Sequence, residues 1–162
     1  MPGPAGAAVH RIGRIDFDPD SLTAGSPEQE EERRIAVKDL LADNYFEPEG
    51  APGGPYELKL GCADNRLEIS VSGPDFEKRH LLSLQPFRRI IRDYFMVCDS
   101  YREAVRGASS QQIEALDMGR RGLHNEGSEL LRERLAGKAK TDHETARRLF
   151  TLLCALHWRG LI

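Results

Sequence analysis

The chain of 162 residues contains little cysteine, a single tryptophan and no long apolar run. Its three cysteines, Cys62, Cys98 and Cys154, form no C-x-x-C motif, which argues against a disulfide framework or a zinc site. We expect all three to be inert core residues in a reducing compartment. No segment approaches the roughly 20 apolar residues of a membrane span, and the first residues lack a secretory signal's apolar core. The sequence therefore predicts a cytoplasmic protein with no membrane contact.

The motifs of common enzymes are missing as well. The chain has no G-x-G-x-x-G, no Walker loop, no G-x-S-x-G and no H-E-x-x-H. A metal site built from His124, Glu126 and Glu129 is disfavoured, because positions 124 and 126 point to different faces of one helix. We predict no catalytic residue, no metal and no cofactor, and the balance is against an enzyme.

Composition and length indicate one ordinary globular domain. Hydrophobic residues make up 40% of the chain and charged residues 30%, with a net charge of −3. Such a charge is far from the strongly basic balance of a dedicated nucleic-acid binder. We expect a single domain over residues 1–162, with a disordered N-terminus over 1–9.

Three strands are predicted in the first half of the chain. In residues 10–17 Ile12 lies out of phase with Ile15, and a bulge at Gly13 restores the alternation. Residues 56–62 and 67–71 alternate apolar and polar side chains around an Asp-Asn pair, which predicts a β-hairpin.

The first helix is predicted to begin at Ser26, where Ser26 and Gln29 form a capping box, and to stop by residues 47–48. Residues 47–55, rich in proline and glycine, read as a flexible loop. After Gly73-Pro74 the pattern is helical, over about 84–106, 109–135 and 141–158. Thr141 and Glu144 suggest a second capping box. The predicted class is α+β: a small βαββ sheet of three strands, followed by three C-terminal helices that pack on it.

Three glycines, Gly119, Gly122 and Gly127, interrupt the helical pattern of residues 109–135. Each costs about 1 kcal/mol relative to alanine, so each needs a reason. One interpretation is close packing against a neighbouring helix. The other is a break where the backbone opens towards a ligand.

Four polar residues of this glycine-rich segment form a candidate ligand site: Arg120, Arg121, His124 and Asn125. On a continuous helix Arg120 and His124 share a face, and Asp117 lies one turn before both arginines. Arginines can bind a phosphate or a carboxylate, and His124 can act as an acid or base. The plainer alternative is a polar patch that holds Arg120 against Asp117.

A second candidate surface is a basic stripe on the helix predicted at 84–106. Arg88, Arg92, Arg102 and Arg106 fall within about 80° of arc, and Asp99 partly neutralises them. Such a stripe could contact an acidic protein or RNA phosphates, or it could be a solvated helix face. Trp158, the single tryptophan, is expected to close the core.

Several runs of the chain resemble a known family: YELKLGCADNRLEISV, SLQPFRRIIRDYFMVCDSYREAVR, GRRGLHNEGSELLRERL and TARRLFTLLCALHWRG. Together they are similar to uncharacterised protein family 0262, a set of small alphaproteobacterial proteins, over roughly Arg11 to Gly160. The resemblance implies a bacterial, cytosolic protein. It brings no activity, cofactor or catalytic residue.

Two hypotheses of function follow from the sequence. The first is a non-enzymatic binding or regulatory module, which uses the basic stripe to hold a protein partner or, as a weaker option, RNA. The alternative is an enzyme or sensor that binds a phosphorylated or carboxylated small molecule in the segment Gly119–Gly127.

Overall fold

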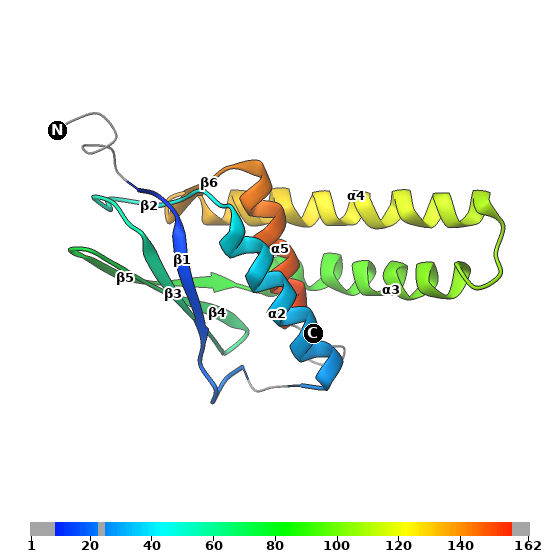
Figure 1. Cartoon of the computed structure of the whole chain (residues 1–162), viewed down its shortest axis with the longest axis horizontal. Helices are drawn as coiled ribbons and strands as arrows, with labels where there is room; N and C mark the ends of the chain where they lie inside the picture. Colours follow the sequence, from blue (N-terminus) through cyan, green and yellow to red (C-terminus); the bar gives the residue numbers. More distant parts are fainter. Residues whose placement is uncertain (1–8, 23–24, 157–162) are drawn as a thin grey trace.

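Figure 1 shows the computed structural model of the chain, which describes residues 9–22 and 25–156. A twisted sheet lies at one end, and a pair of long helices extends away from it as an arm. The four-stranded sheet has the order β1 (Ile12–Phe17), β3 (Tyr56–Ala63), β4 (Arg66–Gly73), β5 (Phe76–Ser83). Strand β1 is parallel to β3, and the other neighbouring strands are antiparallel.

The two local features predicted for the strands are confirmed. The register of β1 against β3 shifts between Ile12 and Arg14, as the bulge at Gly13 requires. Asp64 and Asn65 join β3 to β4 with φ angles of 51° and 61°. Two central residues with positive φ form the turn whose twist suits a tight hairpin.

The α+β class is confirmed, but the prediction of three strands is wrong. A fourth strand, β5, pairs with β4 over its whole length, although no strand was predicted there. A further two-stranded ribbon joins β2 (Phe46–Pro48) to β6 (Ala139–Thr141). Glu47 and Pro48 therefore belong to a strand and not to the predicted loop over 47–55.

The helices largely follow the predicted boundaries. α2 (Pro27–Ala42) begins at the capping box of Ser26 and Gln29, and it ends several residues before 47. A short 3-10 turn (Gln85–Phe87) leads into α3 (Arg88–Ala104). α4 (Ser110–Leu135) starts at the cap residue Ser109 and runs without interruption.

The cap of the last helix, α5 (His143–Leu156), was predicted wrongly. Thr141 is the last residue of strand β6 and pairs with Phe46, so it is not the cap of the helix. The carboxylate of Asp142 instead accepts a hydrogen bond from the backbone N–H of Thr145 at 2.8 Å. Trp158 lies outside the described residues.

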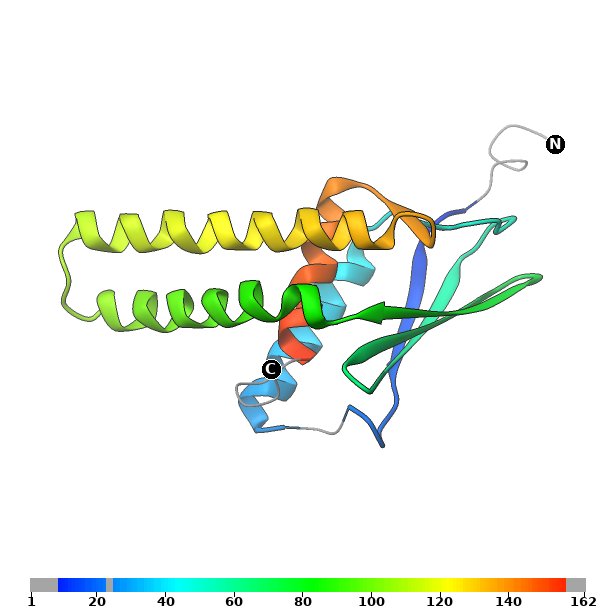
Figure 2. The same cartoon turned by 180° about the vertical axis from the view of Figure 1, so that it is seen from behind.

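The hydrophobic core lies between one face of the sheet and helices α4 and α5. Strand side chains such as Leu58 and Leu60 meet Leu131 and Leu135 of α4 and the leucines of α5. Most of α5 is buried, and it lies between α2 and the α3–α4 pair (Figure 2). The prediction that all three C-terminal helices pack on the sheet holds for α5, for the end of α4 and for the start of α3, where Ile91 is buried in the core. The remainder of α3 and α4 forms the arm.

The three cysteines are free; Cys154 is buried and Cys62 and Cys98 are half-buried. Among the described residues, no helix combines the length and apolar composition that a membrane crossing requires.

Candidate functional site

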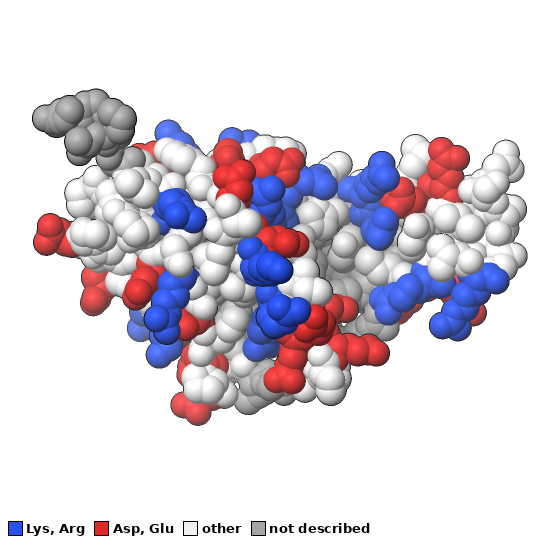
Figure 3. Space-filling view, in the orientation of Figure 1, with Lys and Arg blue, Asp and Glu red and all other residues white. Residues whose placement is uncertain are grey.

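A hollow of about 300 Å³ lies where α5 crosses α3 and α4. Its lining comes from α3 (Tyr94), α4 (Arg120, Arg121, His124) and α5 (Glu144, Arg147, Arg148, Thr151). Figure 3 shows lysine and arginine side chains over α2, α5 and the adjoining part of α4, with acidic side chains among them. Three of the four residues predicted for a ligand site therefore meet in one place.

The two arginines of α4 share one carboxylate, as the spacing predicted. Asp117 pairs with Arg120 through one oxygen, and its other oxygen lies 3.0 Å from Nη2 of Arg121. The guanidinium of Arg120 also stacks over the ring of Tyr101, 4.4 Å from its centroid. Arg120 is therefore held firmly, whereas Arg121 keeps a side chain that is 73% exposed.

The two arginines of α5 are tethered from other elements. Nη1 of Arg147 donates to Oδ1 of Asn125, and its Nε lies 3.9 Å from a carboxylate oxygen of Glu144. Nη1 of Arg148 donates to the backbone oxygen of Asp43 at 3.0 Å. Each guanidinium carries five N–H donors, so these contacts engage only part of each group. Asn125 does not line the hollow; it orients Arg147.

His124 forms the inner wall of the hollow. Its ring packs against Phe150 and Tyr94, with centroids 5.2 and 5.6 Å away. Nε2 of His124 lies 2.8 Å from Oγ1 of Thr151, whose hydroxyl donates to the backbone oxygen of Arg147. Since the hydroxyl proton is used there, we assign the Nε2–H tautomer, with His124 donating to Thr151.

The electrostatics of the hollow keep this imidazole neutral. Burial lowers the pKa of His124 to about 4, and the positive charges of Arg147 and Arg120 act in the same direction. The neighbouring Tyr94 has a raised pKa, chiefly because its phenol is buried. At neutral pH the hollow therefore presents guanidinium charges beside two uncharged rings.

The glycines of α4 have different surroundings. A Cβ on Gly127 would lie 2.1 Å from Cζ of Phe150, so close helix packing is the correct interpretation there. A Cβ on Gly119 would meet only Val97, at 3.9 Å, and one on Gly122 would meet nothing within 4 Å. The backbone does not open at any of the three, because α4 is continuous.

The basic stripe lies apart from the hollow. Its four arginines, Arg88, Arg92, Arg102 and Arg106, are exposed on or just beyond α3. Nη2 of Arg102 lies 3.3 Å from the carboxylate of Asp99, which confirms the predicted neutralisation. Among the described residues, none of these four arginines lines the hollow.

Metal binding finds no support in the described part of the chain, where no group of three or more His, Cys, Asp or Glu side chains could hold an ion. Nδ1 of His143 instead lies 3.0 Å from the carboxylate of Glu129.

Sequence reasoning missed five lining residues of the hollow: Tyr94 of α3, and Glu144, Arg147, Arg148 and Thr151 of α5. The four on α5 lie more than 20 positions beyond Arg120 and Arg121. The one signal was an Arg-Arg pair on the polar side of an apolar helix. Only the packing of α5 across α4 gives that pair its meaning.

The family model described as "Uncharacterised protein family (UPF0262)" matches residues 9–159. A UPF0262 protein of Phenylobacterium zucineum is 63% identical over 151 residues, which cover 93% of this chain and 95% of the relative. Relatives from Caulobacter vibrioides (62%, 94% and 96% covered) and Methylobacterium radiotolerans (55%, 93% and 95%) carry the same family name. No solved structure matches the chain.

Proposed function

Because the chain belongs to the uncharacterised family UPF0262 of Alphaproteobacteria, whose name implies no activity, we propose its function from the geometry of the hollow. The protein binds a small anionic molecule, through a phosphate or carboxylate group, in the hollow between α3, α4 and α5. It does so in the cytoplasm, where its three free cysteines stay reduced.

The observation that carries this proposal is the convergence of four guanidinium groups on one hollow. Arg120 and Arg121 come from α4, and Arg147 comes with Arg148 from α5. Against these four charges stand the carboxylate of Glu144 in the lining and those of Asp117 and Asp142 beside it, so the positive charges outnumber the negative ones. A positive cleft with protein walls concentrates anions from solution.

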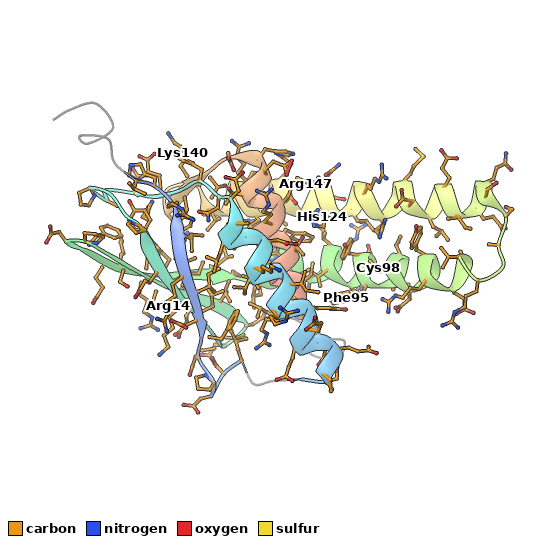
Figure 4. All side chains as sticks on the ribbon, viewed as in Figure 1. Arg14, Phe95, Cys98, His124, Lys140 and Arg147 are labelled. Atoms are coloured by element: carbon orange, nitrogen blue, oxygen red, sulfur yellow. The ribbon has the colours of Figure 1, made fainter. Side chains whose placement is uncertain are left out.

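Tethers around the hollow favour binding because they fix the arginines before any ligand arrives. Figure 4 shows Arg147 and His124 close together at the crossing of α5 and α4. Asn125 holds Arg147, and the backbone of Asp43 holds Arg148. Side chains already fixed lose less conformational entropy on binding, which raises affinity.

The role of His124 supports a binding protein over an enzyme. A catalytic histidine works best with a pKa near the operating pH. The pKa of His124 is about 4, and its Nε2–H is engaged by Thr151. We therefore assign His124 to the wall of the site and not to proton transfer.

A thermal-shift experiment with inorganic phosphate and with acetate, against chloride at matched ionic strength, tests the proposal. At 100 times the dissociation constant a ligand adds about 2.7 kcal/mol, which raises the melting temperature of a chain this size by roughly 5–10 °C. Arg121→Gln removes a donor with few other contacts, and we expect it to reduce the shift to about half or less. Arg79→Gln, which replaces a similarly exposed arginine on β5, is the control and should preserve it. If neither phosphate nor acetate produces a shift, the proposal is refuted.

The basic stripe keeps a second candidate function, a protein partner with an acidic surface. The observation in its favour is that α3 carries these arginines along an arm that extends from the body (Figure 1). Reversing two charges, Arg88→Glu with Arg92→Glu, should abolish binding of such a partner. If binding is retained, the basic stripe is not the partner-binding surface.

A further inference from the structure

We propose that the group taken by the hollow is a dianionic phosphate, free or as a phosphomonoester, and not a carboxylate. This inference rests on the proposed function and narrows it to one chemical class. Three properties of the hollow carry it: the charge of its lining, the directions from which its donors come, and the neutrality of its inner wall.

The charge of the lining favours the more highly charged anion. The lining carries four guanidinium groups and the carboxylate of Glu144, while Asp117 and Asp142 lie outside it and interact with its arginines. A phosphomonoester carries about −1.5 to −2 at pH 7, whereas a single carboxylate carries −1. In a positively charged site the dianion therefore gains more electrostatic attraction than the monoanion.

The donors reach the hollow from two helices. Arg120 and Arg121 stand on α4, while Arg147 and Arg148 stand on α5. A carboxylate presents two coplanar oxygens, which one guanidinium can satisfy by itself in a bidentate pair. A phosphate presents three acceptor oxygens around a tetrahedral centre, so donors from opposite sides can each reach an oxygen. Two pairs of arginines on different helices suit the second geometry.

The inner wall completes the match. His124 is neutral and donates to Thr151, so it adds neither charge nor a competing anion to the hollow. Glu144, 64% exposed at the margin, is the one carboxylate that lines the hollow. Its charge opposes that of a bound phosphate, and this opposition gives a variant that should gain affinity.

Isothermal titration with methyl phosphate and methyl sulfate tests the inference, because these molecules are similar in shape and carry about two charges and one charge, respectively, near pH 7.5. Low ionic strength keeps screening weak. We expect methyl phosphate to bind at least tenfold more tightly than methyl sulfate or acetate. Inorganic phosphate in a further arm shows whether the ester group adds affinity, which separates a phosphomonoester ligand from free phosphate.

Three variants make the result specific to the hollow. Glu144→Gln should tighten methyl phosphate binding about threefold, as expected from removing a like charge a few ångströms away in a solvent-exposed setting. Misfolding cannot mimic a gain in affinity. Arg121→Gln should weaken binding about tenfold or more, while Arg79→Gln on β5, away from both candidate surfaces, should leave it unchanged.

The outcomes separate this inference from the proposed function. Equal affinity for methyl phosphate, methyl sulfate and acetate, all weakened by Arg121→Gln, overturns the dianionic phosphate and leaves an anion site. No binding of any of these anions overturns both proposals. Tighter methyl phosphate binding that Glu144→Gln does not strengthen places the phosphate outside the hollow and also contradicts the inference.

Discussion

The two halves of α4 differ in burial, although they form one continuous helix. The second half, residues 123–135, holds all four of its buried residues: Gly127, Ser128, Leu131 and Leu135. The first half, residues 110–122, packs mainly on α3 and has none. Its surface even includes Met118, which is 67% exposed. One half contributes to the core, and the other extends beyond it.

The candidate site lies at the border between these halves. Arg120 and Arg121 close the outer half, and His124 opens the inner half. At this border the helix is anchored on one side by α5 and still reaches solvent on the other. Such a position gives rigid donors with free N–H groups, which neither a fully buried nor a fully exposed segment offers.

The largest single effect is expected when a leucine is truncated in the second half of α4, and the same truncation in the first half should cost less. Leu131→Ala removes a side chain that is 4% exposed, and we expect a loss of about 3 kcal/mol in the free energy of unfolding. Leu116 is half-buried in the first half of α4, and Leu116→Ala should cost about 1 kcal/mol. Denaturant unfolding measures both, and equal losses would contradict the division of α4.

Glycine replacements in the two halves have smaller individual effects on stability, and these have opposite signs. Gly127→Ala would place Cβ 2.1 Å from the buried ring of Phe150, and we expect a loss of about 2 kcal/mol. Gly122→Ala meets nothing within 4 Å and should stabilise the protein by about 0.5–1 kcal/mol through helix propensity. Thermal unfolding distinguishes them. A destabilising Gly122→Ala would mean that the outer face of α4 is covered in solution.

A still smaller effect depends on pH. The folded-state pKa of His124, about 4, is below its unfolded value near 6.5, so the unfolded chain gains the proton first as the pH falls. Stability from the neutral imidazole is complete above about pH 6.5 and is lost towards pH 4. Because the ring is partly exposed, we expect a loss of about 1–2 kcal/mol. His124→Gln, compared by denaturant unfolding at both pH values, should reduce this loss; an identical pH dependence would contradict the assignment.

The sequence predicted those features that depend on nearby residues. The bulge at Gly13, the turn at Asp64-Asn65 and the cap at Ser26 each rest on a few adjacent side chains. Strand β5 was missed because Lys78 and His80 lie on the same face of the strand as Leu82, which hides the apolar pattern. Edge strands tolerate such residues, since only one side of the strand is paired.

The residues of the candidate site also fall into two groups: those that local spacing brings together and those that only long-range packing brings together. Arg120, Arg121 and His124 could be grouped from the sequence because helical spacing alone puts them together. Arg147 and Thr151 could not, since they join the site only when α5 crosses α4 with Phe150 against Gly127. Long-range packing between helices is not encoded in any local spacing.

A pH titration of His124 by NMR, with and without saturating sulfate, tests the central claim most directly. Sulfate keeps two negative charges across the range, and His124→Gln assigns the ring signals. An anion among the arginines stabilises the charged imidazole, so we predict that sulfate raises the pKa of His124 from about 4 by about one unit. The same pKa with and without sulfate would contradict anion binding in the hollow.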